Sequence, residues 1–151
     1  MGLYKQISTD KTIAGIYGFE PGSKVIRPLF LSNVSAGFPS PADDYIDRQL
    51  DLNEYLIANP AATFFVRVAG DSMIEAGINN NDILIVDRSL EPVSGKIVIA
   101  VINGELTVKR LFKSSSVCLL IAENPDYPDI EINKDMELEI WGVATCAIHN
   151  L

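Results

Sequence analysis

The sequence predicts a mainly β protein with a compact antiparallel fold, one short helix and an extended N-terminal arm. Residues 63–148 alternate short runs rich in Val, Ile and Leu with turn residues, which is typical of compact antiparallel β folds. Residues 1–41 instead hold prolines and glycines without a sustained period. The chain has 151 residues, 48% of them hydrophobic, which is enough to bury one core without disulfides or a structural metal.

The N-terminal arm comprises residues 1–36. Its four basic side chains outnumber its two acidic ones, whereas the whole chain has 12 Lys and Arg against 20 Asp and Glu and a net charge of −8. This change of charge coincides with prolines and glycines near residues 35–41. A junction there separates the arm from a β-rich domain over residues 37–151.

A short helix is predicted at the start of the domain. Residues 51–54, Asp-Leu-Asn-Glu, have the form of a capping box, an acceptor side chain followed three residues later by Glu. The apolar run 55–57 follows, and Pro60 limits the helix at its far end.

The rest of the domain predicts strands over residues 63–69, 83–87, 96–103, 105–112, 117–122 and 139–148. Asn103-Gly104 is a preferred sequence for a type I′ hairpin turn, in which both central residues need positive φ. Counting outward from this turn pairs Val98 with Lys109. Strand alternation then places Lys109 on a largely apolar face, among Val98, Ala100, Ile102, Thr107 and Leu111.

Composition narrows the function classes. The excess of acidic residues argues against a protein that binds DNA or RNA phosphates directly, because that work needs a Lys and Arg surface. The apolar runs are far shorter than the roughly 20 residues that cross a bilayer. Residues 1–11 also lack the apolar segment of a signal peptide. We therefore expect a cytoplasmic protein without a membrane span.

We expect no metal site and no cofactor. The two cysteines, Cys118 and Cys146, lie in predicted strands, where thiols usually act as small hydrophobes. The one histidine, His149, has neither a second histidine nor a Cys-x-x-Cys pair beside it, and no partner for a Ser–His triad is evident in the sequence. The acidic residues between 126 and 139 lack the Gly-centred loop of an EF-hand, so we interpret them as a solvated face.

Ser72 and Lys109 are the candidates for chemistry. Desolvation on an apolar face disfavours the charged form of lysine and lowers its pKa from about 10.4, so that the amine can accept a proton. Ser72 follows a predicted strand directly, where Gly70 lets the chain turn and expose a hydroxyl and backbone amides. Each residue alone also has an ordinary structural explanation. A serine in a turn often caps the turn, and a lysine in a strand often extends its ammonium group to water.

Together with their surroundings these residues resemble the self-cleaving Ser–Lys peptidases of the LexA and UmuD family. The similarity covers roughly residues 36–151 and is carried by Gly70-Asp71-Ser72-Met73, Gly77 and the stretches 82–87, 95–100 and 104–111. It implies a LexA/UmuD-type peptidase fold with Ser72 as nucleophile and Lys109 as general base. The backbone amides of Asp71, Ser72 and Met73 are then candidates for the oxyanion hole.

The resemblance also predicts a cleavage site. Residues 36–43 resemble the self-cleavage region of the family, and Ala36-Gly37 matches its pattern of a small residue followed by glycine. Small side chains in an extended segment flanked by prolines can enter a narrow cleft as a strand. The ordinary alternative for this segment is a flexible linker.

The length of the arm selects a branch of the family. Residues 1–36 are too few for the DNA-binding domain of LexA, which needs about 60 residues, so the UmuD branch is nearer. The resemblance implies an SOS-response autopeptidase that a RecA filament on single-stranded DNA stimulates. Its truncated homodimer would be the accessory subunit of an UmuC-like, error-prone Y-family polymerase in translesion DNA synthesis. Two alternatives stay open, namely a non-enzymatic interaction module and a peptidase that acts in trans on a repressor.

Overall fold

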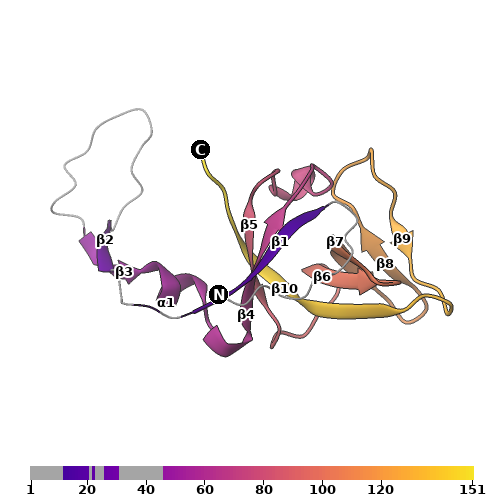
Figure 1. Ribbon diagram of the computed structural model, residues 1–151, viewed down its shortest axis with the longest axis horizontal. Helices are drawn as coiled ribbons and strands as arrows, with labels where there is room; N and C mark the ends of the chain where they lie inside the picture. Colours follow the sequence, from indigo (N-terminus) through magenta and orange to yellow (C-terminus); the bar gives the residue numbers. More distant parts are fainter. Residues whose placement is uncertain (1–11, 21, 23–25, 31–45) are drawn as a thin grey trace. The chain divides into compact units, whose positions relative to one another are not determined.

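The computed structural model describes residues 12–20, 22, 26–30 and 46–151. These residues fall into two compact units. In the larger unit residues 12–20 join residues 59–151, and the smaller unit lies within residues 21–58 (Figure 1).

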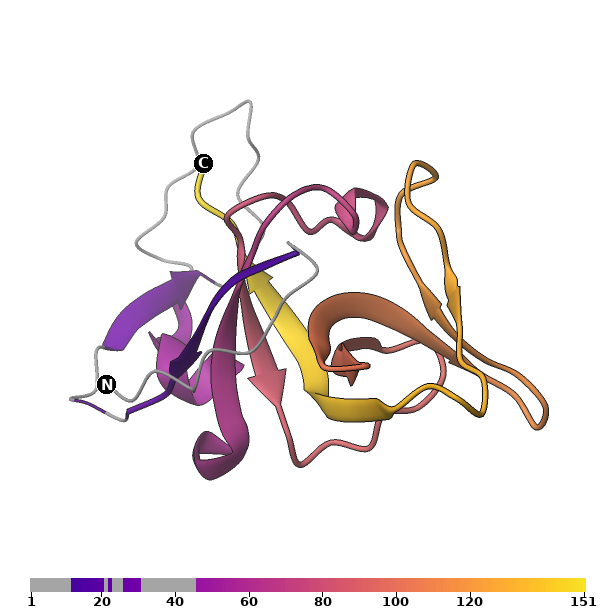
Figure 2. The same cartoon turned by 45° about the vertical axis from the view of Figure 1, so that its right-hand side comes forward.

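The larger unit is built on one antiparallel sheet with the strand order β1-β4-β5-β10-β6-β7-β8-β9. Its strands are β1 (Ile13–Gly18), β4 (Thr63–Val68), β5 (Ile83–Asp87), β6 (Ile97–Ile102), β7 (Glu105–Lys113), β8 (Cys118–Ile121), β9 (Ile130–Glu131) and β10 (Leu138–Ile148). Short 3-10 turns occupy Pro60–Ala62 and Ile74–Ala76. Figure 2 shows β10, in yellow, running between β5 and β6. The predicted mainly β antiparallel fold is confirmed.

The hairpin β6–β7 has the register that its turn predicts. Val98 pairs with Lys109, and Ile102 pairs with Glu105 beside the turn. Asn103 has φ 49° and Gly104 has φ 83°, the positive values of a type I′ turn. The turn chemistry therefore fixes which face of the sheet each residue of the hairpin occupies.

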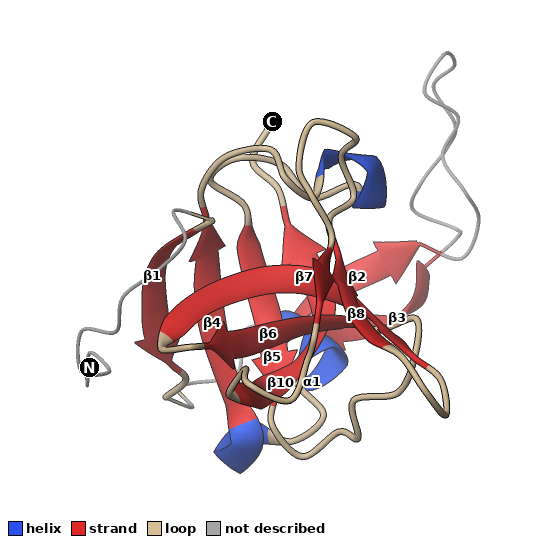
Figure 3. Cartoon of the chain, turned by 90° about the vertical axis from the view of Figure 1, so that its right-hand side faces the viewer, coloured by secondary structure: helices blue, strands red, loops and turns tan. Residues whose placement is uncertain are grey.

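The sheet curls so that it encloses its own core, and Figure 3 shows β7 arching across the strands beside it. One apolar cluster joins the β1–β4–β5 side to β6 and β7 and includes Ile13, Phe64, Val66, Met73, Ile99, Leu106 and Val108. A second cluster includes Val98, Ala100, Ile102, Leu111, Leu120 and Val143. Alternate residues of β6 and β7 thus serve different clusters, and β6 is apolar on both faces.

The smaller unit contains β2 (Ile26–Phe30) paired antiparallel with β3 (Ile46–Asp51), followed by α1 (Leu52–Leu56). The predicted helix is confirmed at its start, because the Asp51 side chain accepts hydrogen bonds from the backbone N–H groups of Asn53 and Glu54. The Ala36-Gly37 bond lies outside the described residues.

The six strands predicted for residues 63–148 are confirmed to within one residue at each end. Four strands were not predicted, namely β1, β2, β3 and β9. Within the described ranges, no helix has the length and apolar character that a membrane span requires.

Candidate active site

Ser72 lies in the turn that follows β4. Gly70 has φ 79°, a left-handed conformation that glycine adopts without strain, and its N–H donates to Asn80 Oδ1 at 2.8 Å. The chain then enters the 3-10 turn Ile74–Ala76, and Met73 inserts its side chain into the first apolar cluster. Ser72 itself is only 3% exposed. The turn is thus anchored on both sides of the serine.

The backbone amides beside Ser72 are the candidate oxyanion-hole donors. Within the described part of the chain, the Ser72 hydroxyl and the N–H groups of residues 71–73 donate no hydrogen bond. Ser72 and Met73 are buried and Asp71 is exposed. An oxyanion hole requires such backbone N–H groups, which no described protein atom accepts from.

Lys109 lies in the middle of β7 and is 4% exposed. Its register partner Val98 and its strand neighbour Leu111 belong to the second apolar cluster, which confirms the predicted apolar face. The amine donates to Thr107 Oγ1 at 2.8 Å and to the Val108 carbonyl at 3.1 Å. A lysine held in such surroundings is poorly solvated, and desolvation disfavours the charged ammonium form.

A segment that the sequence analysis did not single out supports the serine turn. Asn124 is 7% exposed, and its Nδ2 donates to the Asp71 carbonyl at 2.9 Å. The Tyr127 hydroxyl donates to Asp71 Oδ1 at 2.8 Å. We call residues 123–127 the support segment. Its only sequence signal is the Pro125-Asp126 turn, which does not reveal a contact with a residue more than 50 positions earlier.

The support segment also connects the serine turn to the strand that carries Lys109. The carbonyl of Glu123 accepts a hydrogen bond from the Glu75 N–H at 2.9 Å, and its carboxylate pairs with Arg110 Nε. Arg110 is the residue after Lys109 on β7. Glu123 is therefore a bridge between the elements that carry the two candidate residues. Among the described residues, Ser72 and Lys109 share no hydrogen bond.

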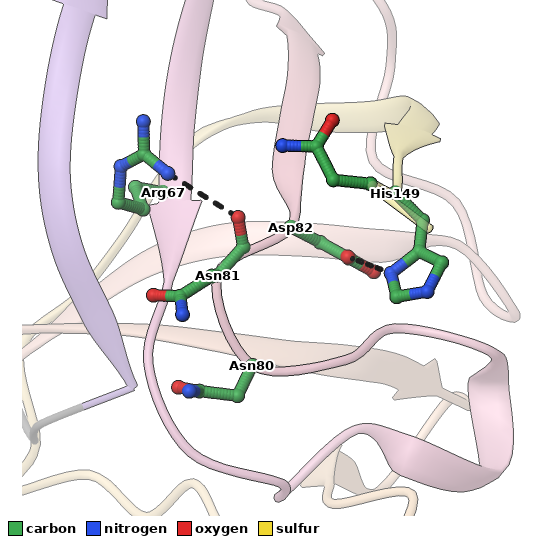
Figure 4. Close-up of a pocket in the computed structure, with 6 residues that line it drawn as sticks. Arg67, Asn80, Asn81, Asp82 and His149 are labelled. Atoms are coloured by element: carbon green, nitrogen blue, oxygen red, sulfur yellow. Dashed lines mark hydrogen bonds and ion pairs between the residues drawn. The ribbon is translucent and has the colours of Figure 1, made fainter.

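A second polar site lies at the far end of the loop between β4 and β5, residues 69–82, which carries Ser72 and which we call the serine loop. His149 Nδ1 lies 2.7 Å from Asp82 Oδ1, and Arg67 Nη1 donates to the Asn81 carbonyl at 3.3 Å (Figure 4). Asp82 is 1% exposed, and its other oxygen accepts from the Asn79 N–H. Sequence reasoning missed this pair because the two residues are 67 positions apart.

The Asp82–His149 pair lines a pocket of about 520 Å³ together with Arg67, Asn80, Asn81 and Asn150. Among the described residues this lining has no Ser, Thr or Cys that would complete a nucleophilic triad. Asp82 and Arg67 instead lie where the chain leaves and re-enters the sheet around the serine loop. Their contacts close the base of that loop.

Comparison with known proteins shows what the chain is similar to. Residues 28–145 match the family described as Peptidase S24-like, and this range includes Ser72, Lys109 and residues 36–37. Protein SamA of Salmonella typhimurium is 51% identical over 122 residues, which cover 81% of this chain and 84% of SamA. Protein ImpA of Escherichia coli is 48% identical over 124 residues, which cover 82% of this chain and 84% of ImpA. LexA repressor 1 of Pseudomonas syringae pv. tomato is 37% identical over 134 residues, which cover 88% of this chain and 66% of the repressor.

Proposed function

This chain belongs to the peptidase S24-like family, and on that premise we propose that it is a Ser–Lys peptidase that cleaves its own Ala36–Gly37 bond. The observation that carries the proposal is the burial of the Lys109 amine on an apolar face of β7. Such a site favours the neutral amine, which is the form that can accept a proton from a serine.

The first chemical step is an attack by Ser72 on its own chain. Lys109 takes the proton of the Ser72 hydroxyl while Oγ forms a bond to the carbonyl carbon of Ala36. Negative charge develops on the carbonyl oxygen, and the amides of residues 71–73 are the proposed donors to it. The Ser72 and Lys109 side chains must approach closely in the reacting complex, as catalytic hydrogen bonds often tighten only when substrate is bound.

The second step breaks the peptide bond. The Lys109 ammonium returns its proton to the nitrogen of Gly37, which leaves as a free amine, and residues 1–36 stay attached to Ser72 as an ester. Water then attacks the ester and loses a proton to Lys109, and that proton returns to Ser72 Oγ as the ester bond breaks. The products are residues 1–36 with a free carboxylate and residues 37–151 with a free amine.

The proposed biological role follows the UmuD-like relatives. We propose that a RecA filament on single-stranded DNA stimulates cleavage during the SOS response. The cleaved homodimer then serves an UmuC-like, error-prone Y-family polymerase as an accessory subunit. The identities of 51% and 48% to SamA and ImpA over most of the chain support this branch of the family.

The test follows the chain length of purified full-length protein, alone and with a RecA filament. We expect a product that begins at Gly37, and no product from the Ser72→Ala variant. Ser115→Ala, which changes an exposed serine, is the matched control and should cleave normally. An uncut wild-type chain under both conditions would favour the interaction-module alternative. Cleavage of added Ser72→Ala protein by the wild type would show action in trans.

A further inference from the structure

The strand β1 occupies the edge of the sheet in the larger unit. It pairs antiparallel with β4, from Ile13 opposite Val68 to Gly18 opposite Phe64, and β5 pairs with the other side of β4. Figure 3 shows β1 at the end of the sheet beside β4. The backbone groups on this side of β4 are therefore satisfied by the N-terminal arm.

Side chains of β1 complete the first apolar cluster. Ile13 is buried in it, and Ile16 packs against it. Phe19 contacts the ring of Phe65 edge to face, with 5.9 Å between the centroids. The Ala69 N–H also donates to the Thr12 carbonyl at 2.7 Å. The first apolar cluster therefore includes side chains from residues that precede the proposed cleavage bond.

Cleavage changes how this strand is held. Before the cut, β1 is tethered to the same chain, and a tethered segment has an effective concentration of order millimolar. After the cut, residues 1–36 are a separate molecule. Its two short strands, β1 on β4 and β2 on β3, must then offset the loss of translational and rotational freedom on their own. Short strands do so poorly, so the cut favours dissociation of β1 at micromolar protein.

We propose that the edge of β4 is a strand-binding site that β1 fills in the uncut chain and that cleavage opens to an extended peptide segment. This proposal rests on the proposed function, because self-cleavage is the step that frees β1. An edge strand with unpaired N–H and C=O groups is a template for β-strand addition, in which the partner supplies a main-chain ladder and alternate side chains fill pockets.

The contacts of β1 define the chemistry of the partner. The segment lies antiparallel to β4 and carries apolar side chains at the places of Ile13 and Ile16, which are three residues apart because the register shifts between Ile13 and Gly15. The place opposite Arg67 is taken by Gly15, so a small residue fits there. The expected partner is an uncharged, extended peptide with this spacing.

The test measures binding of a fluorescent peptide with the sequence of residues 12–20. The peptide is added to cleaved wild-type protein from which residues 1–36 have been removed. Its affinity is compared with that for uncut Ser72→Ala protein. We expect the peptide to bind the cleaved protein at least tenfold more tightly, because β1 of the uncut chain competes at its tethered concentration. A peptide with Ile13→Asp and Ile16→Asp is the matched control and should not bind.

Equal binding to the two proteins, or no binding to the cleaved protein, would overturn the proposal. Retention of residues 1–36 by the cleaved protein at micromolar concentration would overturn it as well. A Ser72→Ala chain with a protease site inserted among residues 31–45 separates the two hypotheses. If the wild type fails to cut itself but this chain binds the peptide after protease treatment, the strand-binding site stands and the proposed self-cleavage fails.

Discussion

The carboxylate of Asp87, at the end of β5, is buried and accepts three hydrogen bonds. Asn59 Nδ2 donates to one oxygen at 2.7 Å, and the Ser89 hydroxyl and N–H donate to the other at 2.6 and 2.8 Å. Burial alone would raise the pKa of Asp87, but these donors outweigh it and hold the pKa below its usual value. Because the folded value is depressed, the stabilisation is present above the ordinary pKa of aspartate and is lost as pH falls through the folded value.

Removing one of these donors gives a pH-dependent effect. The Ser89→Ala variant should lose about 1 kcal/mol of unfolding free energy at pH 7, the usual contribution of one hydrogen bond. The difference from wild type should shrink at pH values below the pKa of Asp87. Urea unfolding of both proteins at pH 7 and in acid checks this, with Ser115→Ala as the exposed control. A difference that stays constant with pH would contradict it.

Asn124 and Tyr127 both donate hydrogen bonds to Asp71, the residue before Ser72. Asn124→Asp keeps the oxygen that accepts from the Asp126 N–H, but it removes the N–H donor to the Asp71 carbonyl. Tyr127→Phe removes the hydroxyl that donates to the Asp71 carboxylate. We expect self-cleavage to slow by roughly ten- to a hundredfold in Asn124→Asp, because a small misplacement of the reacting group has effects of this size. The exposed Tyr127 contact should cost less, about fivefold.

A pH profile distinguishes positioning from a change in the base. Both variants should keep the wild-type dependence of cleavage rate on pH, since the hydrogen bonds that they remove are made to Asp71. Tyr17→Phe, which removes a tyrosine hydroxyl from β1, is the matched control. A shifted profile, or wild-type rates in both variants, would contradict a positioning role.

At the scale of elements, the hairpin β6–β7 orients Lys109, and its turn is the sensitive point. Gly104 has φ 83°, a conformation that costs other residues roughly 1–2 kcal/mol, and a Cβ there would meet no atom within 4 Å. Gly104→Ala should therefore lower the unfolding free energy by about 1 kcal/mol through backbone strain alone. Gly18→Ala also adds a Cβ in open space, without a positive φ, and should change stability by less than about 0.5 kcal/mol. Equal effects in denaturant titrations would contradict this account.

The hairpin and β1 show which elements the sequence can predict. Asn103-Gly104 sets a register by local chemistry, so the face of Lys109 follows from counting. In β1 the register shift between Ile13 and Gly15 places Ile13 and Ile16 in the same cluster although they are three residues apart. This spacing breaks the period of two by which strands are recognised, and no local signal replaces it.

The candidate site likewise contains residues that local sequence patterns predict and residues that they do not. Ser72 and Lys109 are predicted site residues on the basis of a turn, an alternating strand and a family resemblance, which are patterns that the sequence itself displays. Asn124 and His149 could not be identified, because their roles depend on contacts with Asp71 and Asp82 that span more than 50 residues. Such contacts arise from the topology of the whole sheet rather than from a local pattern.

At the scale of the whole molecule, the C-terminal residues close the base of the serine loop. His149→Ala removes the partner of one oxygen of Asp82, a buried carboxylate, and should lower the unfolding free energy by about 1–2 kcal/mol. Asn150→Ala, in the lining of the same pocket, is the control and should have little effect. Thermal unfolding of both variants at neutral pH checks this. Equal losses would show that the Asp82–His149 pair has no special role.

The rate of self-cleavage between pH 7 and 10 tests the central claim most directly. Intact mass should show a product that begins at Gly37 and forms faster as pH rises, because the neutral fraction of the Lys109 amine increases. Ser72→Ala and Lys109→Ala should both stay intact at every pH. The result that would contradict the Ser–Lys account is a Lys109→Ala variant that cleaves with the wild-type pH dependence, or a wild-type chain that stays uncut throughout, with RecA filament present as well.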